Sequence, residues 1–147
     1  MTAAVIGAGY IGLEVAEQLK ERGIEVTILQ RGKHPMSHLD WDMPIRIEDE
    51  MIKQGIDFRP EETIQTLIGE TQLDEAITSK GTKLSADMYI LATGVQPNVS
   101  LAQSIGVNIG ETGAIATDNT LQTNIPGVYA VGDAAESFTH CIYTRYI

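Results

Sequence analysis

The sequence predicts an α/β fold in which a parallel sheet carries an antiparallel three-strand meander as one of its crossovers. Short apolar segments alternate with helical patterns over residues 3–59, as in βαβ units. Three short strand-like segments then follow one another over residues 63–85 with no helical pattern between them. At 147 residues the chain suits one domain with its own core.

The first predicted unit is a strand, a helix and a second strand. Ala3–Ile6 is apolar and ends on a glycine, which is typical of a strand buried on both faces of a parallel sheet. From Tyr10 to Gly23 the apolar residues follow helical spacing. We expect one apolar stripe on this helix, made of Ile11, Val15 and Leu19, with Ala16 as a further candidate. The β-branched segment Ile24–Leu29 completes a right-handed βαβ unit.

The second unit begins with a loop at Lys33–Ser37. A helix is predicted at Asp40–Gln54, and Pro44 falls near its first turn, where proline is tolerated. Apolar residues recur along it at i, i+4 spacing: Met43, Ile47 and Met51. Ile56–Arg59 is the third predicted strand.

The rest of the chain departs from regular α/β alternation. The meander is expected at Thr63–Gly69, Thr71–Ser79 and Thr82–Ser85. Met88–Ala92 then returns to the parallel sheet, and glycine and proline become frequent after Gly94. A short helix is predicted at Ser100–Ile105 and a short strand at Val128–Val131. We place a core at residues 1–95 and a separate segment at residues 96–147.

Composition excludes several classes of protein. With 10 basic and 20 acidic residues the net charge is −10, which argues against a nucleic-acid partner. The single cysteine, Cys141, excludes an intrachain disulfide framework and a CxxC site. His34, His38 and His140 lack metal-ligand spacing, so we expect no metal site. Apolar runs are too short for a membrane span and no signal peptide is visible, so we expect a cytoplasmic protein.

A glycine motif lies between the first predicted strand and helix. Gly7-Ala8-Gly9-Tyr10-Ile11-Gly12 has the GxGxxG pattern, in which Gly7 permits a tight turn and Gly9 lets the backbone approach a pyrophosphate. Gly12 lets the helix pack closely on the strand. The N–H groups and dipole of the helix N-terminus favour phosphates. The sequence therefore predicts dinucleotide binding; the alternative is a glycine-rich turn without a ligand.

The end of the second strand indicates which dinucleotide is bound. An acidic residue there binds the ribose of NAD, whereas a nearby arginine accommodates the 2′-phosphate of NADP. Here Gln30 is neutral and is followed by Arg31, Lys33 and His34 in an otherwise acidic chain. This favours NADPH, through bidentate bonds from Arg31. The alternative is a basic but merely solvated loop.

Three motifs in order resemble the flavin-dependent pyridine nucleotide-disulfide oxidoreductases. They are Gly7–Glu14, Ala92–Asn98 and Gly127–Asp133, and the similarity reaches to about Glu136. Among these enzymes the chain is most similar to the branch of NADH oxidases, NADH peroxidases and coenzyme A-disulfide reductases. The resemblance implies a Rossmann-like NAD(P)H-binding domain, with the segment after residue 95 joining the FAD-binding domain.

The resemblance also implies residue roles. Tyr10 would cover the flavin as a gate, Glu14 would hold the nicotinamide carboxamide, and Gly94 would line the nicotinamide channel. Asp133 would accept a flavin ribitol hydroxyl. Gln30 takes the place of the acidic ribose ligand and Arg31 that of a phosphate-binding arginine. The candidate cofactor-binding residues are thus Gly7, Gly9, Tyr10, Ile11, Gly12, Glu14, Gln30, Arg31, Lys33, Gly94 and Asp133, with no catalytic candidate.

Two parts that the resemblance leads us to expect are absent from the sequence. These are the FAD-binding segment with the redox cysteine and the dimerisation domain, so we expect part of a larger, homodimeric protein. Cys141 lies where the family places no redox cysteine, and we interpret it as an ordinary thiol. The implied chemistry is hydride transfer from NAD(P)H to FAD and then to a disulfide, peroxide or oxygen, with this chain inactive alone. The alternative is a stand-alone dinucleotide-binding redox sensor; a complete small dehydrogenase is disfavoured because no Tyr-x-x-x-Lys pair and no substrate domain are found.

Overall fold

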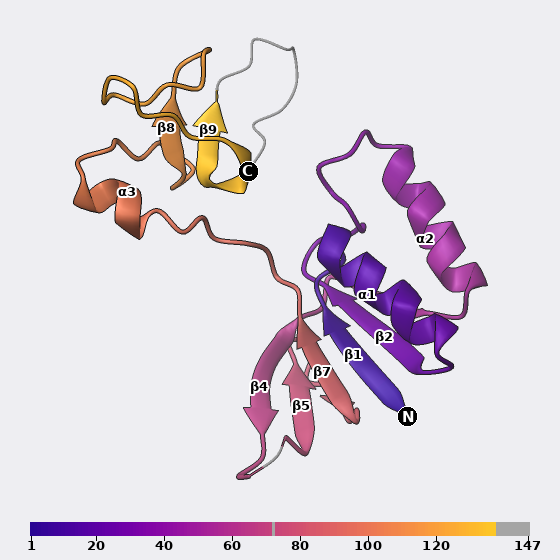
Figure 1. Cartoon of the computed structure of the whole chain (residues 1–147). Coiled ribbons are helices and arrows are strands. Elements are labelled where there is room, and N and C mark those ends of the chain that lie inside the picture. The colour runs from indigo at the N-terminus through magenta and orange to yellow at the C-terminus, as the bar shows by residue number, and fades with distance from the viewer. Residues whose placement is uncertain (72, 138–147) are drawn as a thin grey trace. The chain divides into compact units, whose positions relative to one another are not determined.

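A computed structural model of the chain describes residues 1–71 and 73–137 (Figure 1). It contains two compact units, Met1–Gly94 and Val95–Ile147, which are treated separately below. The expectations for Cys141 and His140 lie outside the described residues. Within the described residues, no helix is long and apolar enough to cross a bilayer.

A four-stranded parallel sheet forms the centre of the first unit. Its strands are β1 (Thr2–Ile6), β2 (Glu25–Gln30), β3 (Asp57–Pro60) and β7 (Met88–Leu91). Their order is β3-β2-β1-β7, so β1 lies between β2 and β7. All three pairings are parallel, which confirms the expected return of the chain to the parallel sheet after the meander.

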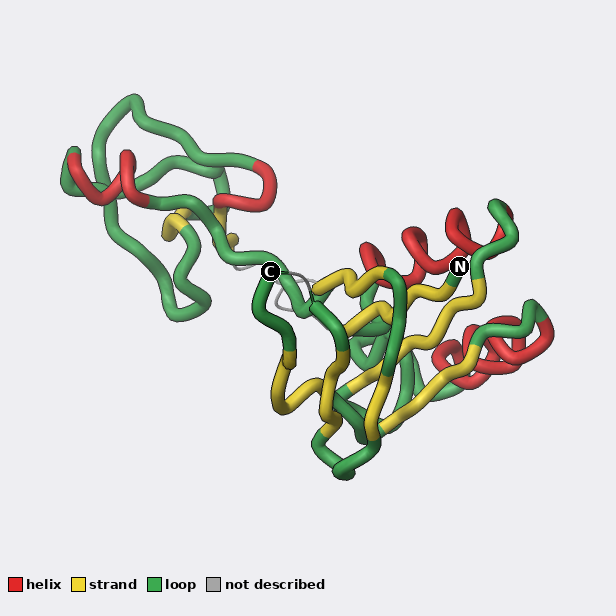
Figure 2. The backbone as a smooth tube through the Cα atoms, turned by 90° about the horizontal axis from the view of Figure 1, so that it is seen from below, coloured by secondary structure: helices red, strands yellow, loops and turns green. Residues whose placement is uncertain are grey.

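Two helices cover one face of this sheet (Figure 2). The first, α1 (Tyr10–Glu21), packs through Gly12, Ala16 and Leu19, and the second, α2 (Met43–Lys53), packs through Met51. The helix α2 begins three residues later than expected, with proline in its first turn. The expected stripe on α1 was wrong for Ile11, whose side chain is 54% exposed. The glycine and alanine on the buried face bring the helix backbone close to the strands, so the longer side chain points away.

The meander covers the opposite face. Strands β4 (Ile64–Ile68), β5 (Glu75–Thr78) and β6 (Lys83–Leu84) pair antiparallel in that order. A second apolar cluster lies between this meander and the sheet, and it consists of Ala4, Ile6, Leu29 and Leu84 with Ile64, Ala86 and Tyr89 beside them. Alternate residues of β1 thus belong to different clusters, Ala3 and Val5 to the one under the helices and Ala4 and Ile6 to this one, which is why β1 is apolar after Thr2.

The second unit is mostly loop. It contains α3 (Ser100–Ser104), a parallel pair of strands, β8 (Ile115–Thr117) and β9 (Ala135–Ser137), and the short 3-10 helix η1 (Gly132–Ala134). The short helix was expected, but the β8–β9 pair was not. The strand expected at Val128–Val131 was wrong: this segment makes one isolated bridge, between Tyr129 and Gln122, at the end of a turn. In the part of the chain that the structure describes, no second strand pairs along its length.

Candidate functional site

The glycine motif forms the tight connection between β1 and α1. Gly7 has φ +109°, and its N–H donates to the carbonyl of Leu29 at 2.8 Å. A Cβ on Gly7 would collide with the carbonyl oxygen of Ala92, directly after β7. That carbonyl cannot easily move, because the Ala92 N–H is itself bonded to Ile6 at 2.8 Å. Both the dihedral angle and the close approach therefore require glycine at position 7.

The other two glycines have different surroundings. A Cβ on Gly12 would collide with the carbonyl oxygen of Gly7, so this glycine lets α1 pack directly against the turn. Gly9 has φ −85° and ψ −172°, which any residue can adopt, and a Cβ there would meet nothing within 4 Å. Gly9 is therefore not required by the fold itself. Open space beside it leaves the backbone accessible to a ligand.

The N-terminus of α1 is free to attract an anion. No side chain caps the helix, and its first turn contains no acidic residue. The Leu13 N–H donates to the Gly9 carbonyl at 3.0 Å, which is the first hydrogen bond of the helix. The N–H groups before Leu13 in the first turn therefore have no acceptor within the helix. Such groups, together with the helix dipole, favour phosphate oxygens.

The end of β2 is joined to this turn by a side chain. Gln30 Oε1 accepts the Ala8 N–H at 3.1 Å, and Gln30 Nε2 donates to the His34 carbonyl at 3.4 Å. The His34 ring lies 3.2 Å from Glu48 of α2, so its charge, when present, is paired within the protein. Arg31 and Lys33 are exposed, and among the described residues neither side chain makes a hydrogen bond or ion pair.

Three further candidate residues lie on α1, with their side chains exposed. Tyr10 is 62% exposed and contacts His38, with 5.0 Å between ring centroids and an interplanar angle of 47°. Ile11 and Glu14 follow it on the same helix, and both are exposed. Leu91, which pairs with Ile6 directly before the glycine turn, is 66% exposed. Apolar surface is therefore left uncovered at this end of the sheet.

The remaining candidates are placed elsewhere. Gly94 is exposed and ends the first unit, three residues after β7. Asp133 is an exposed residue of η1 in the second unit. Ten of the eleven candidates thus lie in the first unit, and Asp133 lies in the second.

A groove of about 660 Å³ lies between α1 and α2, away from the glycine turn. Its apolar lining includes Leu13, Ile47 and Met51, and its charged lining includes Glu14 and Arg46. Glu14 is the only candidate residue among the residues that line it. In the described part of the chain, no group of three or more His, Cys, Asp or Glu side chains is arranged to hold a metal ion.

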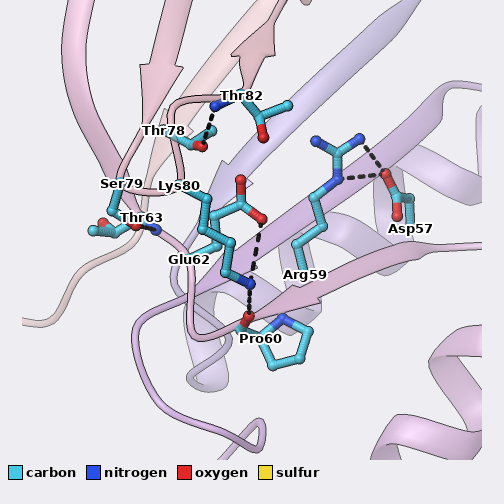
Figure 3. A network of polar contacts seen from close by, with 9 residues as sticks. All are labelled: Asp57, Arg59, Pro60, Glu62, Thr63, Thr78, Ser79, Lys80 and Thr82. Atoms are coloured by element: carbon cyan, nitrogen blue, oxygen red, sulfur yellow. Dashed lines mark hydrogen bonds and ion pairs between the residues drawn. The ribbon is translucent and has the colours of Figure 1, made fainter.

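A polar network beside the end of β3 was not expected from the sequence (Figure 3). The Glu62 side chain is 7% exposed, and its Oε2 lies 3.8 Å from the Nζ of Lys80. Lys80 also donates to the Pro60 carbonyl at 2.9 Å, which holds the β5–β6 turn over residues 60–63. Within the described residues Glu62 Oε1 has no partner. No local pattern predicts the burial of Glu62, because this residue follows another glutamate in a polar stretch.

Comparisons with known proteins agree on one family. Residues 1–145 match the family described as pyridine nucleotide-disulphide oxidoreductase. The NAD(P)H sulfur oxidoreductase (CoA-dependent) of Pyrococcus abyssi is 40% identical over 144 residues, which is 97% of this chain and 32% of that protein. The chain thus spans about a third of the length of such curated relatives.

Two solved structures share the fold. A NAD-dependent persulfide reductase from A. fulgidus matches with a TM-score of 0.85 and 35% identity, over 92% of this chain and 25% of that one. An engineered water-forming NADPH oxidase bound to NADPH matches with a TM-score of 0.79 and 32% identity, over 92% of this chain and 30% of that one. The glycine turn, the parallel sheet with its meander and these matches place the chain in one group: it belongs to the pyridine nucleotide-disulphide oxidoreductase family.

Proposed function

We propose that this chain is the NAD(P)H-binding part of an FAD-dependent oxidoreductase, which passes hydride from NAD(P)H to FAD and then electrons to a disulfide, peroxide or oxygen. The observation that carries the proposal is the turn between β1 and α1. It leaves open space beside Gly9 at an uncapped helix N-terminus without acidic residues. A homodimeric parent enzyme and a cytoplasmic location belong to the same proposal.

The residues of the turn fit a pyrophosphate. The backbone at Gly9 is accessible, and the first-turn N–H groups of α1 supply donors. The two cofactors supply the redox chemistry when bound, a hydride given by the nicotinamide and taken up by the flavin. The role of this chain is to hold the dinucleotide in position, which is where the protein contributes most in such reactions.

Exposed side chains beside the turn suit the rest of this proposal. Tyr10, Ile11 and Leu91 leave apolar surface at the end of the sheet where a nicotinamide ring would lie. Glu14, exposed one helical turn after Tyr10, would hold the carboxamide. For the flavin the chain offers Asp133, an exposed carboxylate that can accept a hydroxyl hydrogen bond. FAD-binding and dimerisation domains of the parent enzyme would supply the remaining contacts.

We further propose NADPH as the preferred nucleotide. Arg31 and Lys33 are exposed, and the residue before them is a neutral glutamine. The engineered NADPH oxidase carries a glycine-to-alanine exchange and, 18 positions later, exchanges of an aspartate for alanine and of the next alanine for arginine. Gln30 and Arg31 form the same neutral–arginine pair 18 positions after Gly12. Position 12 itself differs, because it remains glycine in this chain.

Titration calorimetry on the 147-residue chain tests both parts. We expect NADPH to bind more tightly than NADH, and Arg31→Ala to weaken NADPH binding by about 10- to 150-fold, the value of one charged hydrogen bond. Arg22→Ala, at the far end of α1, is the matched control and should change neither affinity. Preference for NADH would contradict the choice of nucleotide, and failure to bind either would contradict the function. The chain should also purify without FAD; stoichiometric bound flavin would show a complete flavin site.

A further inference from the structure

The side chain of Gln30 links two segments that are far from each other in sequence. Its Oε1 lies 3.1 Å from the Ala8 nitrogen in the glycine turn. Its Nε2 lies 3.4 Å from the carbonyl oxygen of His34 in the loop after β2. The orientation of the amide is set by its partners, because an N–H must be met by the oxygen and a carbonyl by the NH₂ group.

Backbone bonds support this link on both sides. The Met36 N–H donates to the Ala8 carbonyl at 2.9 Å, so the loop and the turn are tied twice. The Gln30 carbonyl accepts the Glu62 N–H at 3.0 Å, which fixes the start of the loop. Met36 is 6% exposed and has φ +47°, a strained value that only a well-determined surrounding maintains. The loop backbone is therefore held, while its cationic side chains point into solvent.

Only a neutral amide of this length can make both side-chain bonds. A glutamate could accept the Ala8 N–H, but its second oxygen would face the lone pairs of the His34 carbonyl. A methionine would fill the same space and make neither bond. The glutamine at position 30 therefore has two consequences. It offers no carboxylate to ribose hydroxyls, and its two hydrogen bonds hold the basic loop against the glycine turn.

We propose that Gln30 is a positioning residue for nucleotide selection, coupling the glycine turn to the loop so that Arg31 and Lys33 face the 2′-phosphate of a bound dinucleotide. This inference rests on the proposed function, because it takes the turn as the pyrophosphate site. The distance between pyrophosphate and 2′-phosphate is fixed within the nucleotide. Selection therefore depends on how firmly the loop is held relative to the turn.

A double-mutant cycle on the 147-residue chain tests the coupling. NADPH and NADH affinities are measured by calorimetry for the unmodified chain, Gln30→Met, Arg31→Ala and the double variant. We expect Gln30→Met to weaken NADPH binding by a larger factor than NADH binding, because NADH has no 2′-phosphate for the loop to meet. We also expect the effect of Arg31→Ala to shrink to under about threefold in the Gln30→Met background. A purely structural defect would lower both affinities together.

Two further variants complete the design. Gln65→Met makes the same exchange on an exposed glutamine of β4 and should change neither affinity. Gln30→Leu removes both side-chain bonds and stays neutral, so it should show the same loss of coupling, and it serves if the methionine variant does not fold. Additive effects of the Gln30 and Arg31 substitutions, with NADPH binding intact in the parent chain, would overturn this inference alone. Absence of binding of either nucleotide to the parent chain would overturn the proposed function and the inference together.

Discussion

Alanine substitutions at Gly7 and Gly9 should separate folding from nucleotide binding, although both glycines belong to one motif. At Gly7 an alanine would have to adopt φ +109° and would collide with the Ala92 carbonyl oxygen. At Gly9 the backbone is already extended, and a Cβ would meet nothing within 4 Å. The same chemical change is therefore strained at one position and unhindered at the other.

The expected magnitudes differ clearly. Holding alanine at a positive φ costs about 1–3 kcal/mol, and forcing a methyl group against fixed backbone costs about 1–3 kcal/mol more. Gly7→Ala should therefore lower the free energy of unfolding by about 2–6 kcal/mol, a large share of the 5–15 kcal/mol that is typical of a domain. Gly9→Ala loses only the slight N-cap advantage of glycine over alanine, about 0.5–1 kcal/mol.

Urea unfolding followed by far-ultraviolet circular dichroism measures the first effect, and NADPH calorimetry measures the second. Gly9→Ala should fold almost normally and lose most of its NADPH affinity, because its Cβ occupies the space that the pyrophosphate would approach. Gly7→Ala should instead show a lower free energy of unfolding. Equal stability of the two variants would refute the geometric reasoning, and undiminished NADPH binding by Gly9→Ala would refute the assignment of the open space.

Two other predictions concern stability. Leu29→Ala should lower the free energy of unfolding by about 2–5 kcal/mol, because the Leu29 side chain is fully buried under the meander. Ile52→Ala should have little effect, because Ile52 on α2 is 61% exposed. Similar urea midpoints of the two variants would contradict the burial of Leu29. The pKa of Asp118 is lowered chiefly by the Thr120 hydroxyl and then by two backbone N–H groups. The ionised carboxylate therefore stabilises the fold above the ordinary pKa of 3.8, and this contribution is lost as the pH falls through the lower pKa of the folded state. In the Asp118→Asn variant the urea midpoint of unfolding should therefore fall less steeply below about pH 4. The same dependence of this midpoint on pH in the variant and the unmodified chain would contradict the stabilising role of Asp118.

Local patterns were enough to predict most of the first unit. The four parallel strands, both helices and the meander were expected in the correct order, with boundaries shifted by a few residues. These elements depend on signals within a few residues, such as β-branched runs, helical spacing and the glycines that end helices. Ile11 shows the limit of spacing alone, because α1 is buried through Gly12, Ala16 and Leu19, whereas Ile11 is exposed.

The second unit was harder to predict because its pairings are not local. Strands β8 and β9 have only three residues each and come from segments about 20 residues apart. The apolar segment Val128–Val131 resembles a strand, but it lies after a tight turn and makes a single bridge. A strand needs a partner along its length, and no property of the segment itself specifies one.

The sequence by itself determined the family, the glycine turn and the neutral residue followed by cations after β2, because these depend on residue type and short spacing. The tertiary structure decided what that neutral residue does. Only the packed fold brings Gln30 between Ala8 and His34, buries Glu62 beside Lys80 and leaves open space at Gly9 but not at Gly7. Such contacts join segments that pack at fixed distances only after the sheet has formed, so no pattern within one segment can specify them.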